Sequence, residues 1–106
     1  MTAAAVVLVT VPNARVARRL SDALVGEGLA ACVTALSGAK STYRWKGKIE
    51  RATEVVLMIK TRMSRVKKLE RRVRELHPYE VPEILALPVA AGEARYLRWI
   101  AESTRP

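Results

Sequence analysis

The sequence predicts a single α+β domain over residues 1–106, in which helices pack on one face of an antiparallel sheet. Four apolar runs, rich in β-branched residues, have the length of strands. Two segments between them repeat their apolar residues with a helical period, and glycines and prolines separate the segments. The predicted order is strand, helix, strand, strand, helix, strand, with a short helix after the last strand.

The first strand and helix fall in the N-terminal quarter of the chain. Residues 6–11 form a continuous apolar run before Pro12, which is typical of a central strand covered on both faces. Asn13 can cap the helix that follows. Gly26 and Gly28 end this helix. Its apolar face has helical spacing and consists of Val16, Leu20, Ala23 and Leu24.

A long hairpin is predicted next. Residues 29–45 form one extended strand with a bulge or bend at Gly38. Lys46 and Gly47 supply a tight turn, and residues 48–60 return as the third strand. We expect the tip of this hairpin to project beyond the domain.

The C-terminal part predicts a helix, an edge strand and a final helix. Ser64 opens the first of these helices, whose apolar stripe is Val66, Leu69, Val73 and Leu76. Residues 84–89 form an apolar run, and Pro88 restricts that end to an edge or a strand terminus. The final helix begins at about Glu93. Its apolar side, which we expect to pack against the core, is Tyr96, Leu97, Trp99 and Ile100.

This order of elements is that of a ferredoxin-like βαββαβ sandwich, here with an additional C-terminal helix and an extended hairpin. The first strand is central, and both main helices lie on one face. Such a sheet leaves one face and two edges uncovered. We therefore expect other copies of the chain to cover them, because subunits of a closed assembly use the same surfaces.

Composition excludes several classes of protein. The single cysteine, Cys32, cannot form an intrachain disulfide, and the apolar run near the N-terminus is too short to cross a membrane. We expect a cytoplasmic protein with no membrane contact. The net charge of +9 is concentrated in residues 40–54 and 64–77. Without a long basic run or many aromatic residues, this pattern favours a solvated surface over a nucleic-acid site.

One connector, residues 77–84, concentrates the chemically active side chains. Its sequence is His-Pro-Tyr-Glu-Val-Pro-Glu-Ile, and it contains the only histidine. The two prolines prevent a helix from continuing through it. The connector is thus a shaped join between a basic helix and the last strand, and the first place to look for a site.

Two specific motifs stand out, the connector and the upstream Tyr43-x-Trp45-x-Gly47; weaker ones are Ala30-Ala31-Cys32-Val33, Lys60-Thr61 and Tyr96-Leu97-x-Trp99. Together these motifs resemble the divalent-cation tolerance family CutA over about residues 5–102. The resemblance implies a homotrimer shaped like the PII signalling proteins and a role in tolerance of copper and other divalent ions. It implies no established catalytic mechanism, and we predict a protein that is not an enzyme.

The candidate metal ligands are His77 and Glu83, for copper(II) or another divalent ion. The copper ligands that the resemblance implies fall on Thr10, Leu76 and Glu83, so only the carboxylate is retained. The alternative for His77 is an imidazolium that caps the C-terminus of its helix. The alternative for Glu83 is an ion pair with Lys60 or hydrogen bonds from the backbone. Cys32 is expected to be a small buried residue rather than a ligand or a nucleophile.

The remaining candidates belong to clefts and subunit contacts. Lys60, Tyr79 and Glu80 are predicted to line a ligand cleft. Tyr43 and Trp45 lie two residues apart on one strand face and are predicted to contact a neighbouring subunit. We therefore expect a binding or sensory module of the divalent metal response, with copper among the candidate ions. The alternative is a PII-like signalling module that binds a small anionic ligand at subunit clefts.

Overall fold

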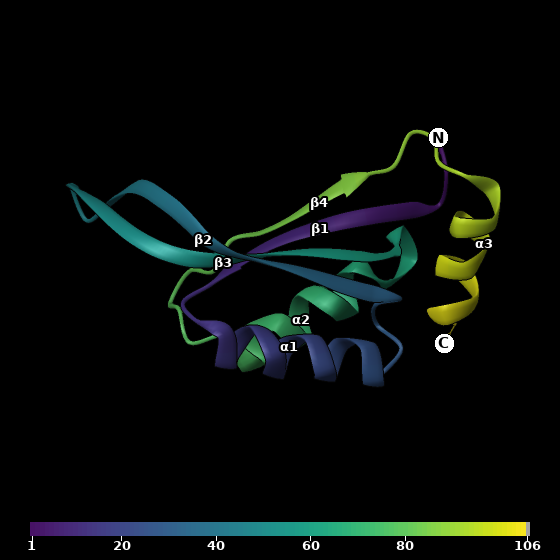
Figure 1. The fold of residues 1–106 in the computed structure, drawn as a ribbon, viewed down its shortest axis with the longest axis horizontal. Helices are drawn as coiled ribbons and strands as arrows, with labels where there is room; N and C mark the ends of the chain where they lie inside the picture. Colours follow the sequence, from purple (N-terminus) through teal and green to yellow (C-terminus); the bar gives the residue numbers. More distant parts are fainter. Residues whose placement is uncertain (106) are drawn as a thin grey trace.

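The computed structural model describes residues 1–105 and contains one four-stranded antiparallel sheet (Figure 1). The strands are β1 (Ala4–Val11), β2 (Cys32–Trp45), β3 (Lys48–Arg62) and β4 (Ile84–Pro88). Their spatial order is β2-β3-β1-β4. The predicted central position of β1 and the edge position of the proline-containing strand are therefore confirmed.

Two helices cover one face of this sheet, as predicted, and a third lies at its end (Figure 1). They are α1 (Ala14–Gly26), α2 (Val66–Leu76) and α3 (Ala94–Ser103). The Asn13 side chain accepts a hydrogen bond from the Val16 N–H and so caps α1 as expected. The predicted start of α2 at Ser64 is wrong, because a single 3₁₀ turn occupies residues 63–65 and no side chain caps the helix.

The core lies between the helices and the sheet. Alternate residues of β1 point into it, and their partners on β3 do the same because paired residues share a face. The fully buried side chains of this layer are Val7, Val9, Val11, Leu20, Leu24, Leu57, Ile59, Leu69 and Val73. The other face of β1 carries Val6 and Leu8, which are only partly buried. The expectation that both faces of this strand are covered is thus wrong within one chain.

The β2-β3 hairpin extends far beyond the rest of the sheet (Figure 1) and gives the molecule its elongated shape of 44 × 25 × 23 Å. Its pairing register shifts between Leu36 and Ala39, which confirms the bulge predicted at Gly38. Lys46 and Gly47 both have positive φ, 50° and 80°, as a two-residue hairpin turn requires.

The second strand begins at Cys32 rather than at Leu29 as predicted. The N–H groups of Leu29 and Ala30 both donate to the carbonyl oxygen of Leu24 in the last turn of α1. This hydrogen bonding completes the end of the helix, so these backbone groups are not free to join the sheet.

The predicted packing of α3 is only half correct. Ile100 and Leu97 contact the small residues Ala4 and Ala31 in a second apolar cluster. Tyr96 and Trp99, in contrast, are each 44% exposed, and their rings stack on each other with centroids 5.6 Å apart. A helix that lies at the end of a sheet can bury only one narrow side, which explains the error. No helix within residues 1–105 is long and apolar enough to span a membrane.

Candidate functional site

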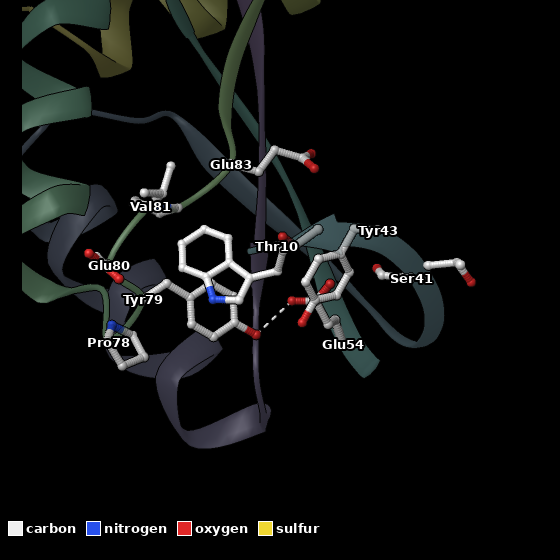
Figure 2. A pocket seen from close by; sticks show the side chains of 12 residues that line it. Thr10, Ser41, Tyr43, Glu54, Pro78, Tyr79, Glu80, Val81 and Glu83 are labelled. Atoms are coloured by element: carbon white, nitrogen blue, oxygen red, sulfur yellow. Dashed lines mark hydrogen bonds between the residues drawn. The ribbon is translucent and has the colours of Figure 1, made fainter. Parts of the chain in front are cut away.

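The connector and the hairpin enclose a pocket of about 730 Å³ (Figure 2). Residues 78–83 form one wall, and Glu54 and the start of the projecting hairpin form the other. The hairpin residues that line it are Ser41, Thr42, Tyr43 and Trp45, and Thr10 contributes from the end of β1. The structure thus brings five of the seven predicted site residues together: Tyr43, Trp45, Tyr79, Glu80 and Glu83.

The two walls are joined by the hydroxyl of Tyr79, which donates a 2.6 Å hydrogen bond to Oε2 of Glu54 (Figure 2). Glu54 is only 6% exposed. Burial of the Tyr79 ring, followed by its hydrogen bond to the Glu54 carboxylate, raises the pKa of Tyr79 well above that of an ordinary tyrosine. The phenol therefore remains a neutral donor at physiological pH.

His77 lies beside this pocket, and backbone groups engage both of its ring nitrogens. Nδ1 accepts the N–H of Tyr79 at 3.1 Å, and Nε2 lies 2.7 Å from the carbonyl oxygen of Thr10. A carbonyl oxygen can only accept, so Nε2 carries the proton and the ring is in its neutral form. The imidazole therefore fixes the connector to β1. It does not cap the helix as a cation, because only the backbone N–H of His77 bonds to the last turn of α2.

Lys60 is placed elsewhere. Its ammonium group donates to Oγ1 of Thr34 at 2.7 Å and to the carbonyl oxygen of Met58 at 3.0 Å. It does not line the pocket, and the ion pair between Lys60 and Glu83, one of the alternatives considered for this glutamate, is not present among residues 1–105. A role for Lys60 in a cleft between subunits stays a prediction.

Cys32 is also remote from the connector. Cys32 pairs with Lys60, and Lys60 pairs with Val6 of β1. His77 contacts Thr10, which lies four residues, or roughly 13 Å, from Val6 along the same strand. The thiol is partly exposed rather than buried, and Sγ lies 3.6 Å from the hydroxyl of Tyr96.

The described residues do not fit a closed copper(II) site. Copper(II) favours imidazole nitrogen, whereas the nitrogens of His77 are both hydrogen-bonded to backbone groups. Within residues 1–105, no three side chains of the types His, Cys, Asp and Glu converge as metal ligands. The residues that line the pocket do include three glutamates, Glu54, Glu80 and Glu83, together with Thr10, Ser41 and Thr42. Its donor atoms are thus oxygens.

Glu54 is the charged site residue that the sequence did not identify, and Ser41 and Thr42 were missed as well. The strand register offers a signal that could have found the glutamate, because Val56 pairs with Thr10 and Glu54 lies two residues further on the same face of β3. The connector is held against the end of β1 by the contact between His77 and Thr10. Glu54 lies at the neighbouring position of β3, so its side chain can reach the connector.

Comparison with known proteins gives a consistent result. The model of the CutA1 divalent ion tolerance protein family matches residues 5–103. A Thermus thermophilus protein named divalent-cation tolerance protein CutA is 50% identical over 99 residues, which cover 93% of this chain and 96% of that protein. The chloroplastic protein CutA of Arabidopsis thaliana is 45% identical over 100 residues. The match covers 94% of this chain but only 55% of the plant protein.

Solved structures agree. The CutA structure from Xylella fastidiosa superimposes with a TM-score of 0.96 at 43% identity, covering 98% of this chain and all of that one. The T. thermophilus divalent cation tolerance protein gives a TM-score of 0.94 at 49% identity, with 96% and 99% of the two chains covered. Sequence and fold thus agree over nearly the whole chain, which belongs to the CutA1 divalent ion tolerance family.

Proposed function

We propose that this protein is a binding module of the cellular response to divalent cations, and that its ligand is a cation held in the pocket between the connector and the hairpin. Relatives named for tolerance to divalent cations support the first part. The single observation that carries the second is the charge of the pocket. Three of its lining residues are glutamates, and none of its described lining residues is a lysine, an arginine or a histidine.

This charge pattern is opposite to that of the whole chain, whose net charge is +9. Fixed negative charges in a concave site raise the local concentration of cations. The same charges oppose a small anion, and the lysine that we considered for an anionic ligand is tied to Thr34 outside the pocket. A cation-binding module is therefore favoured over a PII-like module for small anions.

The oxygen donors favour hard ions such as Mg²⁺ or Mn²⁺ over copper(II). Because the carboxylates do not converge on one point, we propose that the ion keeps part of its water shell and is held by one or two of them. A binding role is favoured over catalysis, because His77, the only histidine, has both ring nitrogens occupied by backbone groups.

Calorimetric titration with Mn²⁺, Mg²⁺ and Cu²⁺ tests this assignment. Glu83→Gln should weaken the binding of Mn²⁺, because it removes one pocket charge while keeping the size of the side chain. The matched control is Glu102→Gln, an exposed position in α3 that does not line the pocket. Copper binding that depends on His77 and ignores Glu83, or the absence of any saturable divalent binding, would overturn the proposal.

We also propose that the working form is a homotrimer, the assembly that the family resemblance implies. The support is the helix-free face of the sheet. Leu85 and Leu87 of β4 are about half exposed and pair with Leu8 and Val6 of β1 on this face. Leu36 of β2 is likewise exposed. An apolar sheet face of this kind is usually an interface.

The cytoplasm remains our predicted compartment. Relatives are named for different ones, since the Arabidopsis protein is called chloroplastic and an Archaeoglobus fulgidus structure is described as periplasmic. Localisation of the tagged protein in its own cell tests this prediction.

A further inference from the structure

We propose that the same pocket takes an organic cation, an amine or guanidinium group attached to an apolar body, in addition to a metal ion. This inference rests on the proposed function, because it uses the same negative charges. It goes beyond it by assigning a second class of ligand, and three independent features of the pocket support it.

The first feature is size. A volume of about 730 Å³ lies within the range of pockets that hold small organic molecules, roughly 300–1,000 Å³. A metal ion with its first shell of water needs far less room. The apolar side chains of Pro78, Val81 and Pro82 line the same space and would remain in contact with water if the ligand were an ion alone.

The second feature is aromatic. The pocket is lined by Tyr43, Trp45 and Tyr79, which together are three of the five aromatic side chains of the Tyr and Trp types in the chain. The faces of such rings attract ammonium and guanidinium groups. Within the chain, Nζ of Lys46 lies 5.7 Å from the centroid of the Trp45 ring, so one face of this ring already holds a cation.

The third feature is an acceptor with spare capacity. Glu54 is more than nine-tenths buried, and Tyr79 is the only described residue that donates to its side chain. That bond uses Oε2, so Oε1 has no donor from the protein while the residue lines the pocket (Figure 2). Oε1 is in contact with solvent in the pocket, so it is free to accept a hydrogen bond from a ligand. An N–H of a protonated amine can donate this bond and also supplies the opposite charge. Aromatic rings alone would attract a cation whether or not it has an N–H group.

These features define the ligand chemically. Its nitrogen carries a positive charge and at least one N–H for Glu54, and its body is apolar and fits between the aromatic rings and the prolines. Neutral and anionic molecules with the same body lack the interaction with the carboxylates. The measurement must therefore compare the affinities of ligands that have the same shape but different charges.

The experiment uses the full chain and three probes that share a phenyl group and a short linker: phenethylamine, phenethyl alcohol and phenylacetate. Calorimetry at neutral pH should show saturable binding of the amine, at least tenfold weaker binding of the alcohol, and none of phenylacetate. Glu83→Gln should weaken binding of the amine by about tenfold, and Trp45→Leu should do the same at a protein concentration where sedimentation velocity shows the assembly of the wild type. Trp99→Leu, an exposed tryptophan outside the pocket, and Glu102→Gln serve as matched controls.

Equal binding of the amine and the alcohol would overturn the inference, because the pocket would then recognise only the apolar body. Absence of saturable amine binding would also overturn it. Titration of Mn²⁺ on the same variants separates this result from the proposed function. If the protein binds Mn²⁺ but not the amine, only the proposal of an organic cation is rejected. If it binds the amine but not Mn²⁺, only the proposal of a metal ion is rejected. Circular dichroism of each variant confirms that the comparison is made on folded protein.

Discussion

The hydroxyl of Tyr79 and the carboxylate of Glu54, 25 residues apart in the sequence, meet at 2.6 Å and close the pocket between the connector and the hairpin. Tyr79→Phe should therefore destabilise the protein by about 1–3 kcal/mol, because it leaves a buried carboxylate without its donor. The free energy of unfolding from urea titration measures this effect. Tyr43→Phe is the matched control, since its ring is exposed and its hydroxyl has no hydrogen-bond partner among residues 1–105; the loss there should stay below about 0.5 kcal/mol.

The raised pKa of Tyr79 predicts a loss of stability in alkali. The folded protein favours the neutral phenol, because ionisation would place a second negative charge beside Glu54 in a partly buried site. The contribution is thus fully present below the pKa of an unfolded tyrosine, about 10, and is lost as the pH rises above it. Unfolding free energies measured from neutral pH to above pH 10 should fall more steeply for the wild type than for Tyr79→Phe. Parallel curves for the two proteins would contradict this origin of the effect.

The two hydrogen bonds of the His77 ring predict a structural role that is separable from ligand binding. His77→Ala removes both bonds and leaves the partly buried carbonyl of Thr10 without this partner, at a cost of about 2 kcal/mol. His77→Asn should recover part of this loss, since its amide offers a donor and an acceptor. The affinity for Mn²⁺ should change little in whichever variant stays folded. A large loss of affinity in the stable His77→Asn variant would instead make the imidazole a ligand.

Much of the fold follows from local patterns. The apolar stripe of α2 and the bulge at Gly38 depend on residues close in sequence, so period and turn chemistry are sufficient to predict them. The errors occur where a tertiary contact decides. Leu29 continues an apolar run, yet its N–H is taken by the end of α1. Trp99 has a large apolar side chain of the kind usually found in a core, but α3 contacts the sheet only along the side that carries Ile100.

The site was harder to predict than the fold for the same reason. The connector is conspicuous because its histidine, prolines and carboxylates are adjacent in sequence. Its counterpart Glu54 is an ordinary residue of a charged hairpin, and it becomes part of the site only through strand register. The hydrogen bonds that occupy His77 likewise depend on the carbonyl of Thr10, 67 residues away. Composition can thus identify candidate ligands, but only the folded chain shows which of them remain free.

The proposed homotrimer predicts a specific role for Trp45 at the exposed end of the hairpin. Trp45→Ala should weaken the assembly, because an aromatic side chain in such a position is best covered by a neighbouring subunit. Ile49→Ala is the matched control. Ile49 is a more exposed apolar residue of the same tip, but Trp45 pairs with Lys48, so Ile49 points to the opposite face of the hairpin.

Sedimentation velocity over a dilution series measures the outcome. We expect a trimer for the wild type and for Ile49→Ala, and smaller species at low concentration for Trp45→Ala. If Ile49→Ala dissociates and Trp45→Ala does not, the opposite face of the hairpin forms the contact. If both variants sediment and unfold like the wild type, the subunits meet only through the part of the helix-free face formed by β1 and β4, and Trp45 acts solely within the pocket of its own chain.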